Sequence, residues 1–187
     1  MTPNRRTLLA GAGATLASLS LAACGNGIGS PAPTQIDARV DATLQHMFSA
    51  YPGTVDISNQ AAGMLVMPLI TEAGLGLGGS YGRGALRVGG ATVDYYLATA
   101  ASAGLQIGAQ QYSHVLFFMT QDALLDFRAG NGWSAGGDIE YAIPSQGEML
   151  RADALTSLSP VIAVVFAQAG LRVGATVEGT KYTRIIP

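Results

Sequence analysis

Charged residues are scarce in this chain of 187 residues. Asp, Glu, Lys and Arg together make up 12% of the sequence, against about 25% in an average soluble domain. Ten basic and twelve acidic residues give a formal net charge of −2, so the chain lacks the basic excess that displaces counterions from nucleic acid. Its 49% of hydrophobic residues also exclude a disordered chain. We therefore expect a globular domain without a nucleic-acid partner.

Cysteine, histidine and lysine are almost absent. The single cysteine, Cys24, cannot form an internal disulfide. The two histidines, His46 and His114, have no carboxylate cluster beside them in the sequence, which argues against a metal site. Lys181 is the only lysine, and none of the glycine-rich segments contains the Gly-Lys pair of a phosphate-binding loop. We expect no metal, no cofactor and no catalytic activity.

Two glycine motifs match known nucleotide-binding and catalytic patterns, but the residues around them do not fit such sites. Gly74, Gly76 and Gly79 match G-x-G-x-x-G, but the residues that follow cannot begin a helix and no βαβ unit surrounds them. Residues 132–136 match the nucleophile elbow G-x-S-x-G. A hydrolase of that class has its histidine after the serine, and both histidines precede Ser134. We interpret Ser134 as a serine at the end of a strand.

The first 23 residues are similar to an export signal. Arg5 and Arg6 precede a small, apolar run that continues to Ala23, and no acidic residue occurs before Asp37. This run is too short to cross a bilayer comfortably as a helix. The pair of arginines resembles a twin-arginine signal, with general secretory export as the alternative. We expect residues 1–23 to be a removable signal peptide.

The end of this segment resembles a bacterial lipobox. Leu21, Ala22 and Ala23 precede Cys24, whose sulfur takes a diacylglycerol in lipoproteins. Cleavage would leave Cys24 as an N-terminus carrying acyl chains such as palmitate, which is an essentially permanent anchor. Gly25 follows instead of the aspartate typical of inner-membrane retention, so the resemblance implies the periplasmic face of the outer membrane. The alternative is a small buried thiol.

The remaining sequence predicts a flexible tether and one α+β domain. Residues 24–35 are mainly Gly, Asn, Ser, Pro, Ala and Thr, as in a linker. Residues 36–187 begin with an amphipathic helix that ends at Pro52, followed by a short helical turn over 55–62. A further short helix has Thr120 as its N-cap. The apolar face of the first helix comprises Ile36, Val40, Leu44, Met47, Phe48 and Tyr51.

The strands of this domain are rich in glycine. An apolar run over 64–70 contains Pro68, which suggests a bulge or an edge. An antiparallel meander of four strands is expected next, with a tight turn at Gly89 and Gly90. These four strands are 81–88, 92–99, 105–110 and 114–119. Later strands are expected over 133–143, 161–166, 171–177 and 181–186. So many glycines in strands predict a strongly curved antiparallel sheet or a partly closed barrel.

Segments of this strand region resemble the SYLF family of lipid-binding domains. The most specific are Gly-Leu-Gln-Ile-Gly-Ala-Gln at 104–110 and Gly-Gly-Ser-Tyr-Gly-Arg-Gly at 78–84, with looser similarity elsewhere between residues 61 and 179. The resemblance implies non-catalytic binding of an acidic phospholipid or another envelope lipid. Eukaryotic members are associated with phosphoinositide membranes and, in fungi, with actin. This chain departs from them in being poor in lysine, with Lys181 alone, which weakens an electrostatic mode of membrane binding.

Two sets of residues are candidates for lipid contact. The cationic set, which could hold a lipid phosphate, is Arg83, Arg87, Arg172, Lys181 and Arg184; the alternative is scattered surface charge. The apolar set, which could dock an acyl chain or a membrane, is Met47, Phe48 and Tyr51; the alternative is core packing. The sequence thus predicts a lipid-binding envelope lipoprotein. An envelope scaffold that binds protein or peptidoglycan is the alternative, and the oligomeric state stays open.

Overall fold

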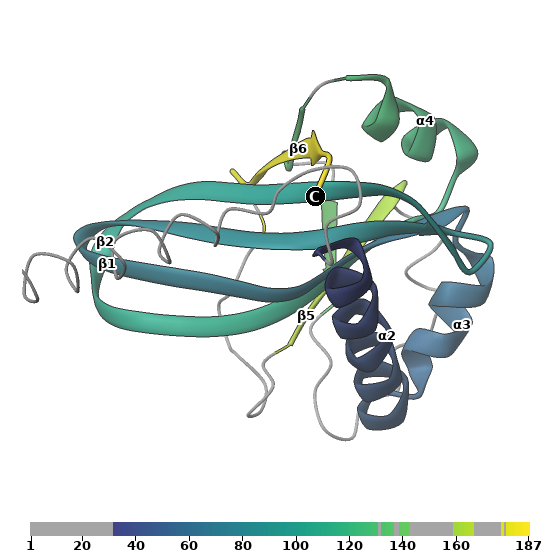
Figure 1. Cartoon of the computed structure of the whole chain (residues 1–187), viewed down its shortest axis with the longest axis horizontal. Helices are drawn as coiled ribbons and strands as arrows, with labels where there is room; N and C mark the ends of the chain where they lie inside the picture. The colour runs from purple at the N-terminus through teal and green to yellow at the C-terminus, as the bar shows by residue number, and fades with distance from the viewer. Residues whose placement is uncertain (1–31, 131, 137–138, 143–158, 167–176, 178) are drawn as a thin grey trace, which may run out of the picture.

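The computed structural model describes residues 32–130, 132–136, 139–142, 159–166, 177 and 179–187. Three helices and a sheet of six strands lie in this part of the chain (Figure 1). The helices are α2 (Ala32–Ala50), α3 (Gly53–Gln60) and α4 (Gln121–Ala129). The strands are β1 (Gly63–Val88), β2 (Ala91–Phe118), β3 (Trp133–Ser134), β4 (Ile139–Ala142), β5 (Val161–Phe166) and β6 (Lys181–Ile185). The sheet is strongly curled, and the predicted α+β class with a curved antiparallel sheet is confirmed.

One long hairpin makes up most of the sheet. β1 and β2 pair antiparallel along their whole length, from Gly63 opposite Phe118 to Val88 opposite Ala91. The predicted turn at Gly89 and Gly90 is confirmed, because both glycines have the positive φ of a tight hairpin. The prediction of four separate meander strands is wrong. The expected strands 92–99, 105–110 and 114–119 belong to the single strand β2, which ends at Phe118, and 81–88 is the last part of β1. The pairing continues through the intervening segments, with a register shift between Leu75 and Gly76.

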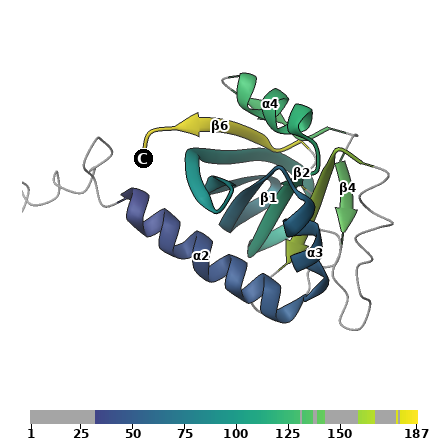
Figure 2. The ribbon, with the colours of Figure 1, turned by 90° about the vertical axis from the view of Figure 1, so that its right-hand side faces the viewer.

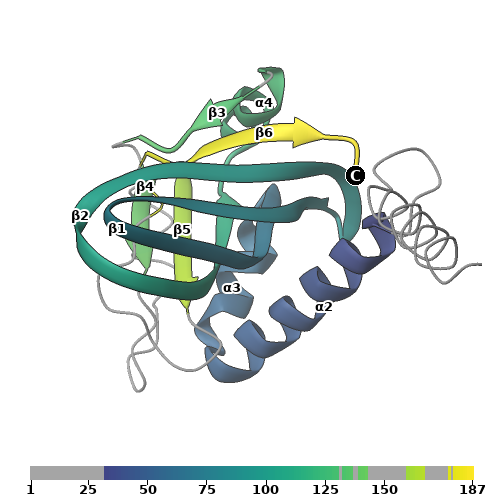
Figure 3. The same cartoon turned by 60° about the vertical axis from the view of Figure 1, so that its left-hand side comes forward.

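The hairpin curls until the two halves of β1 touch (Figure 3). A Cβ atom placed on Gly84 would overlap the carbonyl oxygen of Val66, and one on Gly82 would overlap Ile70. Register shifts in the pairing with β2 occur between Met67 and Ile70, around the predicted bulge at Pro68. The close approach of β1 to itself therefore depends on glycine at two positions.

The curled sheet separates two groups of buried apolar side chains. One face carries Val66, Val115 and Phe117 and packs against α2 and α3. The other carries Leu65, Leu116 and Phe118 and packs against α4. Neighbouring residues of one strand thus face opposite cores, as the two-residue period of a strand requires. Helices α2 and α4 lie on opposite sides of the sheet (Figure 2).

The shorter strands add to β2. β5 pairs with its last part and β6 with its first part, both antiparallel, so the expected strands at 161–166 and 181–186 are confirmed. β3 and β4 occupy two parts of the expected strand over 133–143, and β4 runs parallel to β5. The expected strand over 171–177 falls outside the described residues, apart from the buried Val177. Helix α2 begins at Ala32, four residues before the expected start of the domain.

Replacing Gly84 with alanine should destabilise the domain strongly. The new Cβ would overlap the Val66 carbonyl oxygen, which belongs to the backbone and cannot rotate away, and overpacking of this kind costs about 1–3 kcal/mol. Urea unfolding followed by circular dichroism would measure the loss. Gly136→Ala is the matched control, since a Cβ there meets nothing within 4 Å and the residue is exposed. Equal midpoints for the two variants would contradict the close approach within β1.

Candidate functional site

A groove runs between helix α2 and the bulged part of β1. Its first hollow has a volume of about 410 Å³ and lies between Ala42 and His46 of the helix and Phe166 of β5. A second hollow of about 320 Å³ reaches Arg83 on the other half of β1. Both hollows are lined by Arg39, Pro68 and Leu69. Because they share these residues, the two hollows adjoin, and we call them together the α2–β1 groove.

The bulge at Pro68 shapes the floor of this groove. Proline has no N–H to give to a ladder, and the pairing of β1 with β2 shifts between Met67 and Ile70. The carbonyl oxygen of Pro68 instead accepts a hydrogen bond of 2.7 Å from the buried hydroxyl of Ser113. Leu69 is left half-buried, so its side chain contributes apolar surface to both hollows.

Of the Asp, Glu, Lys and Arg side chains in the described residues, Arg39 and Arg83 line the α2–β1 groove. Arg39 is exposed and forms no ion pair within the described part of the chain, while Arg83 donates a hydrogen bond of 2.8 Å from Nε to the hydroxyl of Tyr81. The imidazole of His46 lies beside Phe166, with ring centroids 6.1 Å apart. None of the described residues that line the groove is acidic. The groove therefore suits a ligand that combines negative charge with apolar surface.

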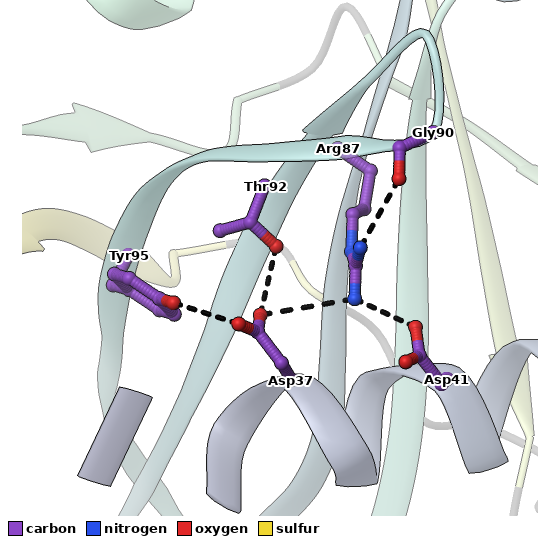
Figure 4. A network of polar contacts seen from close by, with 6 residues as sticks. All are labelled: Asp37, Asp41, Arg87, Gly90, Thr92 and Tyr95. Carbon is purple, nitrogen blue, oxygen red and sulfur yellow. Dashed lines mark hydrogen bonds and ion pairs between the residues drawn. The ribbon is translucent and has the colours of Figure 1, made fainter. Parts of the chain in front are cut away.

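Arg87 has a different role from Arg83, although both lie on β1. Its Nη2 atom is 2.6 Å from the Asp41 carboxylate and 3.7 Å from that of Asp37, and Nη1 donates to the Gly90 carbonyl at 3.1 Å (Figure 4). The Arg87 side chain is only 13% exposed. Arg87 thus connects α2 to the end of the β1–β2 hairpin, and in this structure its guanidinium is occupied by protein carboxylates.

Asp37 also accepts hydrogen bonds from two side chains of β2. Its two carboxylate oxygens accept hydrogen bonds from the Thr92 hydroxyl at 2.7 Å and from the Tyr95 hydroxyl at 2.8 Å (Figure 4). Burial and, next, the hydrogen bond to Asp37 raise the pKa of Tyr95, so its hydroxyl is protonated and donates. We call these side chains of Asp37, Asp41, Arg87, Thr92 and Tyr95 the helix clasp. The helix clasp fixes the position of α2 relative to the groove.

The apolar candidates of α2 belong to the core. Met47 is fully buried, and Phe48 and Tyr51 are half-buried and pack against the same cluster as Val66 and Phe117. Tyr51 also lies beside Phe166, with ring centroids 6.0 Å apart. The apolar face of α2 therefore covers the sheet, and a membrane could reach it only if the helix left the sheet.

The remaining candidates lie away from the groove. Lys181 is exposed on β6. Arg184, on the same strand, lies 3.5 Å from the Asp94 carboxylate and donates to the carbonyl oxygen of Arg128 at 2.9 Å. Arg172 and the expected lipid anchor Cys24 fall outside the described residues. Of the four cationic candidates that the structure describes, only Arg83 lines the groove.

The sequence did not indicate Arg39 as a binding residue, and His46 was considered only as a metal ligand. Both lie on the polar side of the amphipathic pattern, and such residues usually face solvent. Their spacing of seven residues places them on one face of the helix, with Thr43 between them. This spacing could have indicated that the two residues share one surface of the helix. The sequence could not show that β1 lies opposite this surface, because that position depends on the bulge at Pro68 and on the contact between the two halves of β1.

His114 lies in the core and Ser134 lies on the surface. His114 is fully buried in the core, where its Nε2 atom lies 2.8 Å from the Tyr182 hydroxyl, and its Nδ1 atom has no partner among the described residues. Burial lowers its pKa to about 3, so the ring is neutral. Ser134 is exposed on β3, as expected of a serine at a strand end. No group of three or more metal-ligating side chains occurs within the described residues.

One family model matches part of the chain. Residues 99–184 match the family Ysc84, described as Las17-binding protein actin regulator. The match confirms the resemblance to the SYLF family over these residues. No curated protein matches the chain. Among the described helices, none is long and apolar enough to span a membrane.

Replacing Asp37 with alanine should loosen the helix clasp. The change removes the acceptor of two hydrogen bonds and one of the carboxylates facing the buried Arg87. Hydrogen bonds to a charged group contribute about 1.5–3 kcal/mol each, but the Asp37 side chain is 33% exposed and solvent weakens its contacts. The free energy of unfolding should therefore fall by less than the sum of two such bonds, by about 1–3 kcal/mol in urea titrations. Asp41→Ala should cost less than about 1 kcal/mol, because Asp41 is 62% exposed. Asp126→Ala, at an exposed site on α4, is the control. If it costs as much as Asp37→Ala, the clasp does not hold the helix.

The buried histidine should make the domain sensitive to acid. Since folding lowers the pKa of His114 from 6.5 to about 3, its contribution is present above pH 6.5 and is lost as the pH falls toward 3. In that range the unfolded chain binds a proton that the folded chain does not, which lowers the free energy of unfolding by up to about 1.4 kcal/mol per pH unit. Urea titrations between pH 7 and pH 4 would show a smaller slope for His114→Gln. The control His46→Gln, at an exposed histidine, should keep the slope of the unaltered chain. Equal slopes for all three proteins would contradict this assignment.

Proposed function

We propose that the chain is a non-catalytic, lipid-binding lipoprotein of a bacterial envelope. The observation that carries the proposal is the α2–β1 groove, in which Arg39 and Arg83 adjoin apolar surface from Leu69 and Phe166. The lipobox-like sequence before Cys24 supports an acyl anchor, and Gly25 supports the periplasmic face of the outer membrane. The domain would then bind lipid beside the membrane to which it is attached.

The groove has the two kinds of surface that an acidic lipid requires. Guanidinium groups form charge-assisted hydrogen bonds with phosphate or carboxylate oxygens, and Arg39 carries no competing ion pair within the described residues. Apolar walls next to these donors can cover part of an acyl chain. The match of residues 99–184 to a family described as Las17-binding protein actin regulator supports a role in binding. Because residues 1–23 resemble a bacterial export signal, we favour lipid as the bound partner.

Sedimentation with lipid vesicles would test this function. The full chain carrying Cys24→Ser, which excludes a covalent acyl chain, is mixed with phosphatidylcholine vesicles that contain increasing fractions of phosphatidylglycerol, at low and high salt. We expect the bound fraction to rise with phosphatidylglycerol and to fall with salt, because exposed charges are screened. Arg39→Ala combined with Arg83→Ala should weaken binding about tenfold or more, as expected for two charge-assisted contacts.

Lys181→Ala is the control that removes a positive charge from β6 without altering the groove. It should bind vesicles as the parent chain does. If Lys181→Ala weakens binding and the double arginine variant does not, the lipid contact lies on the β6 side of the domain. An absence of binding to every vesicle would favour the alternative of an envelope scaffold that binds protein or peptidoglycan.

A further inference from the structure

The two hollows of the α2–β1 groove differ in where positive charge lies. The hollow toward Arg83 is lined by both arginines and by Gln35, Thr71 and Tyr81, together with the apolar Ala32 and Ile36; we call it the polar compartment. The hollow toward Phe166 contains Arg39 at its edge, the apolar Ala42, Leu69 and Phe166, and the polar Thr43, His46 and Ser113; we call it the apolar compartment. Arg39, Pro68 and Leu69 belong to both compartments. A ligand that occupies both compartments is matched best when its negative charge lies at the Arg83 end.

The polar compartment favours a negatively charged group. Arg83 is held by its hydrogen bond to Tyr81 at 2.8 Å, which leaves its terminal nitrogens without a partner among the described residues. Arg39 enters the same compartment from the helix and forms no ion pair in the described part of the chain. Arginines from two different elements, with no carboxylate in the lining, provide a site that an anion would neutralise.

The apolar compartment limits the size of the ligand. Its volume of about 410 Å³ is close to the lower end of the range of about 300–1,000 Å³ for small-molecule sites. At its far end, the His46 ring lies beside Phe166, with ring centroids 6.1 Å apart. A compartment of this size, bordered by a helix and a bulged strand, suits one acyl chain better than two.

On the basis of the proposed function, we infer that the groove takes a single-chain anionic amphiphile. Its carboxylate or phosphate would lie between Arg39 and Arg83, and its acyl chain would extend along Leu69 toward Phe166. A fatty acid and a lysophospholipid share this chemistry. The domain would accordingly bind a free, monoacyl form of lipid, and the diacyl lipids of the bilayer would contact it only through their headgroups.

Calorimetric titration of the full chain carrying Cys24→Ser would test the inference. The probes are laurate, lauroyl lysophosphatidylglycerol and dihexanoyl phosphatidylglycerol, each below its micelle-forming concentration. The last two have the same headgroup and the same number of acyl carbons, so they differ in whether those carbons form one chain or two. We expect the single-chain lipid to bind at least about tenfold more tightly than the two-chain lipid.

Ala42→Trp is designed to fill the apolar compartment. Ala42 is exposed on α2 and lines this compartment, so the indole should block the chain without disturbing the core. We expect it to weaken binding of the single-chain lipids about tenfold or more. Ala38→Trp is the matched control, since Ala38 is exposed on the same helix and lines neither compartment. This control should bind as the parent chain does, and Arg39→Ala should weaken binding about tenfold.

The outcomes separate the inference from the function on which it rests. Binding of laurate alone supports a fatty-acid ligand, and binding of lauroyl lysophosphatidylglycerol alone supports a lysophospholipid. Equal affinity for the two-chain lipid, or no effect of Ala42→Trp, would overturn the inference. So would a failure of both single-chain probes to bind a chain that still sediments with anionic vesicles. If the chain binds neither these probes nor vesicles, the proposed lipid-binding function itself is wrong.

Discussion

The contact of β1 with itself is the constraint on which the rest of the domain depends. A flat hairpin of this length would have only two neighbouring strands and no interior. Because Gly82 and Gly84 have no side chain, the second half of β1 can lie directly against the first half at Val66 and Ile70. This curvature gives the hairpin two apolar faces and places α2 and α4 on opposite sides of it.

The groove follows from how α2 sits on this curved surface. Met47 and the other buried residues of the helix pack on one core, while the helix clasp attaches Asp37 and Asp41 to the end of the hairpin. The buried residues of α2 are spaced along the whole helix, so α2 is packed throughout its length. The groove lies beside this line of packing, where Arg39, Ala42 and His46 border the bulge at Pro68.

Sequence patterns predicted the elements whose signals are local. The amphipathic spacing of α2, the Thr120 cap of α4 and the turn at Gly89 and Gly90 each depend on a few adjacent residues, and all three are present. The lengths of β1 and β2 could not be predicted in the same way. Glycine ends a strand in some contexts and bends it in others, and the choice depends on pairing partners that are distant in sequence.

The candidate site was predicted less completely for the same reason. Arg83 and Arg87 fall on the same face of the expected strand over 81–88, yet Arg83 lines the groove and Arg87 is held by carboxylates from α2. Residue type gives the chemistry that a side chain can perform, but only the fold determines which partner reaches it. Arg39 could not be predicted as a groove residue for the same reason, because the residues across the groove from it belong to β1.

Within the described residues, most arginines lie beside a carboxylate, and the arginines of the groove do not. In the described part of the chain, Arg87, Arg128 and Arg184 each lie within 4 Å of an aspartate carboxylate. Arg39 has no such partner there, although it lies beside the acidic residues of its own helix in sequence. A protein with few charges that leaves a guanidinium unpaired in a partly apolar groove retains free donors where a bound anion would be partly shielded from water. Shielding strengthens a charge-assisted hydrogen bond, so the charge of Arg39 is more effective for recognition there than on an open surface.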